Sequence, residues 1–270
     1  MNQSPVALVT GAASGMGRAF AVALAQKGYS LLLLDVNREG LDETVRALGP
    51  GASARPLVVD VSSWDAVREM VASLAGAVER LDLLVNCAAI LGAGAFSEQP
   101  VTTFAKVVQI DLMGPVHLVH ATLPWLRRAR GQIVNLASTA SLHGWPLLAA
   151  YSAAKGALEN FAEAIRPELA RDGIGVTMVF PLLVDTPMLE NQSELPPILR
   201  GGRVSADTVV KRTLKAAARR RRRLYVPFTA RLVALMHGLA PRVLDWWGAR
   251  FGMPPALPES SDRRRLDAPK

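Results

Sequence analysis

Cysteine is nearly absent from this chain, which has Cys87 alone among its 270 residues. One cysteine excludes an internal disulfide framework and is typical of proteins in a reducing compartment. Long apolar runs are absent as well, since none approaches the roughly 18 uncharged residues of a membrane-spanning helix. The first residues also lack the basic segment that opens a signal peptide. We therefore expect a cytoplasmic protein.

Acidic residues are scarce near the carboxyl end. Residues 211–270 contain 15 Lys and Arg but four Asp and Glu, whereas the rest of the chain holds more acids than bases. The net charge of +8 therefore comes from the last part of the chain. No helix-turn-helix, zinc or RNA-binding motif accompanies these charges, so we expect no nucleic-acid partner.

Half of the residues are apolar, and their pattern alternates between that of a strand and that of a helix. Short apolar runs predict parallel strands at residues 6–10, 30–35, 55–60, 81–86, 132–137, 173–180 and 224–226. Helical spacing predicts helices at residues 18–27, 41–48, 64–78, 104–128 and 151–168. The alternation predicts an α/β fold with a doubly wound parallel sheet of about seven strands. We expect one domain over residues 1–228 and a basic helical extension over residues 229–270.

A glycine-rich segment joins the first predicted strand to the first predicted helix. Gly11, Gly15 and Gly17 follow the spacing G-x-x-x-G-x-G, with Ser14 and Met16 between them. Glycines let the backbone turn tightly and approach a pyrophosphate, which then meets the amide groups at the helix start. Because the segment lies between a strand and a helix, it predicts a dinucleotide-binding site formed by these five residues.

Asp35 ends the second predicted strand, about 20 residues after the glycines. A carboxylate at this place accepts hydrogen bonds from the adenosine ribose and repels a 2′-phosphate, which favours NAD over NADP. Arg38 favours NADP instead, because a cation at its position can bind the 2′-phosphate. We expect NAD as the cofactor, with NADP as the less favoured alternative.

Ser138, Tyr151 and Lys155 are the predicted catalytic residues. Tyr151 and Lys155 lie four apart on a predicted helix and so leave the same face, while Ser138 follows a buried strand. The pKa of a free phenol is about 10, too high for a base at neutral pH, and a neighbouring ammonium lowers it. The three residues together predict a site that moves a proton to or from a substrate oxygen.

These motifs, in this order, resemble those of the short-chain dehydrogenase/reductase family from residue 5 to about residue 227. The resemblance implies a single-domain Rossmann-type fold and hydride transfer between NAD and an alcohol or ketone. It also implies that Ser138 holds the substrate oxygen, that Tyr151 transfers the proton, and that Lys155 lowers the pKa of Tyr151 while binding the nicotinamide ribose. Family members suggest a homotetramer or homodimer formed through the helices at 104–128 and 151–170.

Three further motifs match the family: an adenine contact, an element after the fourth strand, and the segment that holds the nicotinamide carboxamide. Their cofactor-binding residues here are Asp60, Val61, Asn86, Ala88, Pro181, Val184 and Thr186. Tyr151 and Lys155 are also expected to contact the cofactor.

Three positions depart from the family's pattern. Asp111 stands where the fourth catalytic residue is usually Asn, while Ala89 and Leu182 stand where Gly is expected. Ala and Leu tolerate positive φ poorly, so either these loops differ or the positions need no positive φ. We include Asp111 among the catalytic residues and expect its carboxylate to stabilise the Lys155 ammonium.

The loop at 142–149, between the predicted catalytic serine and tyrosine, should line the substrate pocket. Trp145, Leu147 and Leu148 in this loop predict a small apolar alcohol or ketone as substrate. We expect His143 in the same loop to be solvated.

Three functions are consistent with these residues. The leading hypothesis is an NAD-dependent dehydrogenase or reductase of apolar secondary alcohols and ketones. The second is an NADPH-dependent carbonyl reductase in which Arg38 binds the 2′-phosphate. The third is a non-catalytic protein that senses the cofactor or is tethered to a membrane, although the intact catalytic trio argues against it. No metal site is expected, because His117 and His120 lack an accompanying cluster of acids or cysteines.

Residues 219–253, which the family resemblance covers poorly, predict two amphipathic helices at 231–239 and 241–251. Each has an apolar stripe, and basic residues accompany both. Three interpretations are open: helices packed on their own domain or a neighbouring subunit, a lid over the active site, and peripheral attachment to an anionic membrane. Of the two functional interpretations, we favour the lid.

Overall fold

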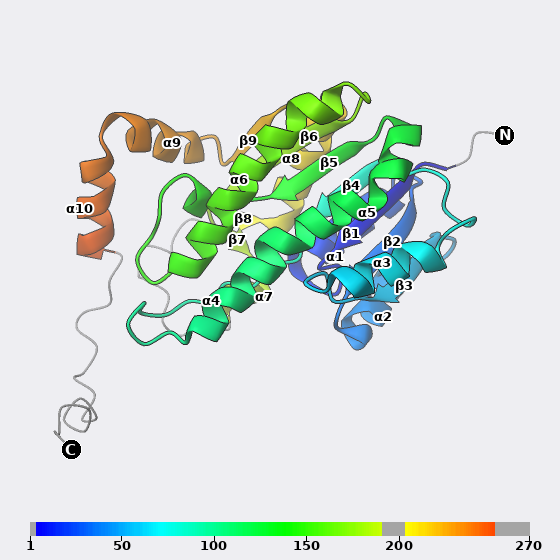
Figure 1. Cartoon of the computed structure of the whole chain (residues 1–270), viewed down its shortest axis with the longest axis horizontal. Helices are drawn as coiled ribbons and strands as arrows, with labels where there is room; N and C mark the ends of the chain where they lie inside the picture. Colours follow the sequence, from blue (N-terminus) through cyan, green and yellow to red (C-terminus); the bar gives the residue numbers. More distant parts are fainter. Residues whose placement is uncertain (1–3, 191–202, 252–270) are drawn as a thin grey trace, which may run out of the picture.

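The structure, a computed structural model, describes residues 4–190 and 203–251. Its centre is a seven-stranded sheet in the order β3-β2-β1-β4-β5-β6-β9, in which every neighbouring pair is parallel. The strands are β1 (Val6–Thr10), β2 (Ser30–Asp35), β3 (Ala54–Val58), β4 (Leu83–Asn86), β5 (Gln132–Leu136), β6 (Gly175–Pro181) and β9 (Arg223–Val226). The predicted doubly wound sheet is confirmed, and its strand order reverses between β1 and β4 (Figure 1).

Helices cover both faces of the sheet (Figure 1). One face carries α3 (Trp64–Ser73), α5 (Gly114–Ala129) and α6 (Ala149–Ala170), with α4 (Val101–Val108) packed beside α6. The other face carries α1 (Gly15–Ala25), α2 (Arg38–Ala47) and α8 (Ala206–Ala218). The remaining short elements near the site are α7 (Pro187–Glu190) and the paired strands β7 (Val184–Asp185) and β8 (Val204–Ser205).

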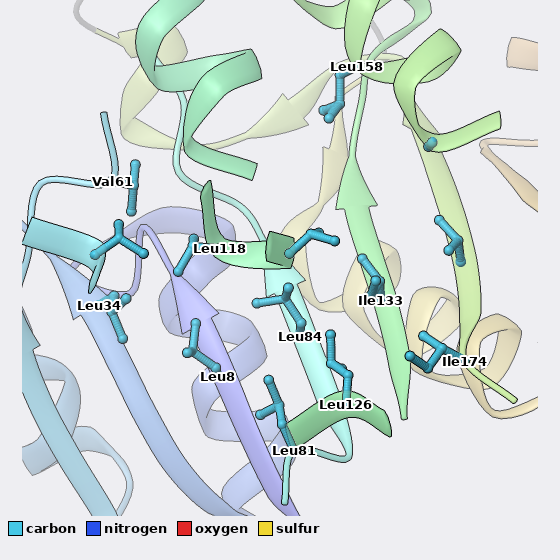
Figure 2. Packing of buried hydrophobic residues seen from close by; sticks show 14 of the residues in the cluster. Leu8, Leu34, Val61, Leu81, Leu84, Leu118, Leu126, Ile133, Leu158 and Ile174 are labelled. Atoms are coloured by element: carbon cyan, nitrogen blue, oxygen red, sulfur yellow. The ribbon is translucent and has the colours of Figure 1, made fainter. Parts of the chain in front are cut away.

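Burial on both faces explains why the strands are continuous apolar runs. Successive side chains of a strand point to opposite faces, so each strand contributes to two cores. Figure 2 shows one of them, in which Leu8, Leu84 and Ile133 from three adjacent strands meet Leu118 and Leu126 of α5. The sheet is thereby fixed as a rigid support for the loops at its carboxyl edge.

The helix predicted at 104–128 is interrupted in the structure. The first part, α4, begins at Val101, and a π-helical turn, Gln109–Met113, separates it from α5. Gly114 then lets α5 pass close to Val61, whose side chain would clash with a Cβ at that position. Turns of this wider kind are rare and frequently occur at functional sites. Elsewhere the predicted boundaries differ from the observed ones by up to five residues, the largest difference being the end of α3.

One helix, α8, is missing from the sequence-based prediction, which counts Lys211, Arg212 and Lys215 with a basic tail. In the structure Ser205 caps this helix, and its apolar face, including fully buried Val209, packs on the sheet. The three basic side chains form the exposed face of α8. They therefore belong to the α/β body, and the predicted tail is not a single basic unit.

The two predicted C-terminal helices are present as α9 (Ala230–Leu239) and α10 (Pro241–Phe251), which we call the C-terminal arm. The arm follows the carboxyl end of β9 and extends away from the sheet (Figure 1). The basic run before β9 lies at the opposite edge, where Arg220 donates hydrogen bonds to the carbonyl groups of Gly173 and Arg130 at 2.5 and 2.7 Å. Residues 219–253 therefore do not form one surface, and residues 252–253 lie outside the described residues. The division of the chain at residues 228 and 229 stays a prediction.

Candidate active site

The loop after β1 can adopt its path only because of its glycines. Gly11 and Gly15 have φ angles of 65° and 49°, a region that other residues rarely adopt. A Cβ on Gly17 would overlap the carbonyl group of Gly11, so the close packing of helix on loop requires glycine. The helix α1 begins at Gly15, three residues before its predicted start. Its first turn, which contains Met16, therefore lines a groove together with Gly11 and Ser14.

Thr10, at the end of β1, joins this loop to the loop after β4. Its hydroxyl oxygen accepts hydrogen bonds from the backbone N–H groups of Cys87 and Ala88, both at 2.9 Å. Gly11 lies directly against the backbone of Ala88, where a Cβ would be 3.0 Å from two backbone atoms. One hydroxyl thus fixes two walls of the same groove.

Asp35 lines this groove, as the sequence predicts. One of its carboxylate oxygens accepts a hydrogen bond from Ala13 N and the other from Asn37 N, each at 3.0 Å. These bonds fix the carboxylate and leave lone pairs on both oxygens free to accept further hydrogen bonds. Arg38 is exposed and turned along α2, with its Nε 3.2 Å from a carboxylate oxygen of Asp42.

The predicted catalytic trio comes together at the carboxyl end of β5. Ser138 caps a short 3₁₀ turn, since its Oγ accepts a hydrogen bond from Ala140 N at 3.1 Å. Tyr151 lies in the first turn of α6 within hydrogen-bond reach of the Ser138 hydroxyl. Lys155 follows one turn later, with its Nζ 5.6 Å from the centre of the Tyr151 ring. Ser138 and Tyr151 both line one cavity and can therefore act on one substrate oxygen, while the Lys155 ammonium lies beside the Tyr151 ring.

Burial and two neighbouring charges act on the pKa of the Tyr151 phenol. Burial raises the pKa of Tyr151 above its ordinary value, the Lys155 ammonium lowers it, and the Asp111 carboxylate raises it. A hydrogen bond with Ser138 lowers the same pKa. The phenol therefore retains its proton more firmly than it would beside an unpaired ammonium.

Asp111, in the middle of the π-helical turn, contacts Lys155 directly. Its Oδ2 lies 3.1 Å from the Lys155 Nζ, and its Oδ1 accepts a hydrogen bond from Ile90 N at 2.9 Å. Both side chains are almost completely buried. Burial raises the pKa of Asp111, whereas the neighbouring ammonium and the Ile90 amide lower it.

The comparison with known protein families agrees with this geometry. The features in question are a glycine loop after β1, an acid after β2 and a Ser-Tyr-Lys trio at the carboxyl edge of one sheet. The family described as short chain dehydrogenase matches residues 5–196. The chain belongs to the short-chain dehydrogenase/reductase family. It is 34% identical to meso-2,3-butanediol dehydrogenase of Serratia marcescens over 183 residues, which cover 68% of this chain and 72% of that protein.

Solved structures, among them a short-chain dehydrogenase/reductase, superimpose on most of the chain. One from Burkholderia phymatum, in complex with NAD, has a TM-score of 0.79 and 27% identity, covering 96% of this chain and 98% of that one. A variant of actinorhodin polyketide ketoreductase with NADPH has a TM-score of 0.75 and 32% identity, covering 84% of this chain and 97% of that one.

Two of the departures from the short-chain dehydrogenase/reductase pattern have no structural consequence for the backbone. Ala89 and Leu182 both avoid positive φ, so these loops need no glycine. Cys87, beside Ala88 in the first of them, is not a nucleophile in this state, because burial raises its pKa to about 12. Asp111 is the departure that changes the chemistry of the site.

Two adjoining hollows contain most of the predicted residues. Asp60, Val61 and Ala88 line the cofactor groove, whereas Pro181 and Val184 line a second, apolar cavity around Ser138 and Tyr151. The residues common to both hollows are Met16, Thr186 and Met188. Asn86 lies below the groove, where its side-chain amide donates to Asn135 Oδ1 at 2.8 Å and ties β4 to β5. Among the described residues no cluster of three or more metal ligands is present.

The C-terminal arm supplies one wall of the site, where the lid interpretation of these helices expects it. Trp247 of α10 lines the apolar cavity, and its ring lies 5.8 Å from that of Trp145, centre to centre. His143 is 8% exposed rather than solvated, because it packs on α9 with its Nδ1 3.3 Å from that of His237. Gly248 of α10 faces Pro146 of the same loop. The helical spacing of apolar residues predicts the apolar stripe of α10. It does not predict that the loop at 142–149 packs against part of this stripe.

Proposed function

We propose that this protein is an NAD-dependent oxidoreductase that transfers a hydride between the nicotinamide and an apolar secondary alcohol or ketone. The observation that carries the proposal is that Ser138 and Tyr151 line an apolar cavity adjoining the glycine-lined groove, with the buried Lys155 beside the Tyr151 ring. Family membership and the NAD complex of a structural neighbour support it.

The groove fits a dinucleotide, because glycine backbone and the start of α1 form a surface that a Cβ at Gly17 would disrupt. The bound nicotinamide supplies or accepts the hydride. Ser138 holds the substrate oxygen, and Tyr151 takes its proton in oxidation or returns it in reduction. Lys155 stabilises the phenolate by its charge and can bind the nicotinamide ribose, while Thr186 lies where it can orient the carboxamide.

A screen of apolar secondary alcohols with NAD, and of the matching ketones with NADH, tests this function directly. We expect absorbance changes of the nicotinamide with at least one pair. Binding of NAD without turnover on any member of a broad panel would instead favour the non-catalytic, cofactor-sensing alternative.

Selection of NAD rests on Asp35. Its carboxylate faces the groove with free acceptor positions, and Arg38 is paired with Asp42 rather than turned toward the groove. A 2′-phosphate would meet the Asp35 charge, and like charges placed together in this way cost several kcal/mol. The alternative is an NADPH-dependent reductase in which Arg38 leaves Asp42 and binds the phosphate.

Replacing Asp35 with Ala should therefore shift the preference from NAD toward NADP by about tenfold or more. The ratio of the two dissociation constants, measured by quenching of the chain's tryptophan fluorescence, reports the shift. Arg38→Ala is the matched control and should leave the ratio unchanged. A wild-type preference for NADPH that Arg38→Ala removes would establish the alternative.

The apolar substrate class rests on the side chains around Tyr151. The cavity walls are almost entirely apolar, with Ser138 and Tyr151 as its polar groups beside Thr139 and Thr186. The residues supplied by the loop after the 3₁₀ turn and by the arm are Trp145, Leu148 and Trp247. Sites of this composition bind apolar ligands and use a few polar groups to orient them.

Trp247→Ala should raise KM for bulky apolar substrates roughly tenfold, because the arm's contribution to the cavity wall is lost. The KM for NAD should not change. Trp246→Ala is the matched control, since Trp246 is the adjacent residue of α10, is 63% exposed and does not line the cavity. Equal effects of the two substitutions, or none, would contradict a role of the arm in substrate binding.

The arm's place at the cavity favours the lid among the three interpretations of these helices. Its outer side chains, including Leu235, Leu239 and Trp246, are exposed, so contact with a neighbouring subunit or with a membrane stays a prediction. No helix within the described ranges is long and apolar enough to cross a membrane. Co-sedimentation with anionic vesicles that moderate salt abolishes would support the membrane contact. A homotetramer or homodimer, as the family resemblance implies, also stays a prediction.

A further inference from the structure

The buried ion pair between Asp111 and Lys155 changes the net charge beside the catalytic phenol. Their charged atoms are 3.1 Å apart, and the two side chains are 0% and 3% exposed. The Oδ2 of Asp111 has no polar neighbour other than this ammonium among the described residues. An ammonium that is fully paired in this way contributes little net positive potential to its surroundings.

The fold, rather than a flexible side chain, holds this carboxylate in place. Asp111 lies on the π-helical turn that packs against α6, and Ile90 N donates to its Oδ1 at 2.9 Å. A carboxylate held by a backbone amide on one oxygen and by an ammonium on the other has few alternative positions. Its place beside Lys155 is therefore a permanent feature of the site.

Among the described residues, few polar groups affect the pKa of Tyr151, and two of these groups carry a charge. These two are Lys155 and Asp111, which have opposite signs. The Ser138 hydroxyl is neutral, and Cys87 is a neutral thiol because burial raises its pKa to about 12. Burial raises the pKa of Tyr151, and Asp111 offsets part of the lowering by Lys155.

We propose that Asp111 is a positioning residue that neutralises Lys155 and keeps Tyr151 protonated at neutral pH, so that the resting site holds the proton donor of ketone reduction. In that direction a hydride from reduced nicotinamide forms the new C–H bond at the carbonyl carbon. The carbonyl oxygen takes the proton of the Tyr151 hydroxyl, which becomes a phenolate and is reprotonated from solvent. The cofactor is oxidised and the ketone is reduced by two electrons. This inference rests on the proposed function and adds the direction of the reaction for which the resting site is protonated.

The same charge arrangement disfavours oxidation at neutral pH. Oxidation needs the phenolate before a proton can be taken from the alcohol, so its rate should rise as pH rises through the pKa of Tyr151. Because that pKa is raised, the rise should fall in the alkaline range. Removing the Asp111 charge leaves the ammonium unpaired, which favours the phenolate and moves this limb toward lower pH.

The direct test is a titration of Tyr151 without cofactor or substrate, followed by the ultraviolet absorbance of tyrosinate. The curve of Tyr151→Phe is subtracted from that of the wild type, and the curve of Asp111→Asn/Tyr151→Phe is subtracted from that of Asp111→Asn. We expect the Tyr151 midpoint of Asp111→Asn to lie about one pH unit or more below that of the wild type. Equal midpoints, or a higher one in Asp111→Asn, would overturn the proposal. Since no turnover is needed, this outcome is independent of whether the proposed function is correct.

Kinetics with an active alcohol and ketone pair give the second readout. Asp111→Asn should retain activity while the alkaline rise of its oxidation rate moves about one pH unit or more toward lower pH, with little change in the KM for NADH. Glu159→Gln is the control, because Glu159 is another buried acid of the same region, 8% exposed and 2.7 Å from Arg223 outside the cavity. It should change neither the pH profile of oxidation nor the titration. If Asp111→Asn does not fold, Asp111→Ser, which is also neutral, serves the same comparison.

Discussion

Tyr151→Phe should lower kcat by about 10²–10⁴-fold, the usual contribution of general acid–base catalysis. The substitution removes a single oxygen atom, so the ring keeps its contacts in the cavity and the packing of α6 is unchanged. The dissociation constant for NAD should stay nearly the same, because most of the groove is formed by other residues. Single-turnover rates together with fluorescence titration of NAD separate these two quantities.

Tyr225→Phe provides the matched control for this loss. Tyr225 lies on β9, stacked on Phe180 with ring centres 5.0 Å apart, and takes no part in the cavity. Its substitution should leave kcat within a factor of about two, because it removes a hydroxyl remote from the reacting atoms. A Tyr151→Phe variant that kept more than about a tenth of the wild-type rate would show that another group transfers the proton.

Gly17→Ala should weaken NAD binding by about fivefold to 150-fold. The added methyl group would overlap the carbonyl group of Gly11, so either the loop or the first turn of α1 must move. Such overpacking costs typically about 1–3 kcal/mol, and each 1.4 kcal/mol corresponds to about tenfold in affinity. Tryptophan quenching by NAD measures the change, and circular dichroism shows that the fold is retained.

Gly238→Ala is the control for an added methyl group. Gly238 lies on α9, where a Cβ would meet no atom within 4 Å, so this substitution should leave NAD binding unchanged. Wild-type affinity in Gly17→Ala would mean that the glycine loop does not form the dinucleotide site.

The seven strands and most of the helices could be predicted because each shows its own pattern in the sequence. The five strands inside the sheet appear as apolar runs, and the helices between the strands show helical spacing. The helix α8 escaped prediction because its exposed Lys211, Arg212 and Lys215 resemble the basic residues that follow. Its buried face became evident only with the sheet that covers it.

The site could be predicted in part for a similar reason. Ser138, Tyr151 and Lys155 are recognisable from local spacing and from the order of motifs along the chain. The contact between Asp111 and Lys155 is not local, because it depends on a π-helical turn within an otherwise regular helical pattern. The position of Trp247 depends on how the arm packs against the loop at 142–148, which helical periodicity alone does not reveal.

The hydrogen bonds of Thr10 have a consequence for the order in which the protein acquires its binding site during synthesis. The glycine loop belongs to the first 20 residues, but one wall of its groove is the backbone of Cys87 and Ala88, held by the Thr10 hydroxyl. In the sheet, β1 pairs with β2 on one side and with the much later β4 on the other. A nascent chain that has only its first two or three strands outside the ribosome therefore lacks half of the groove. Such a chain has to fold further before the cofactor can stabilise it, so early folding depends on the apolar strands alone.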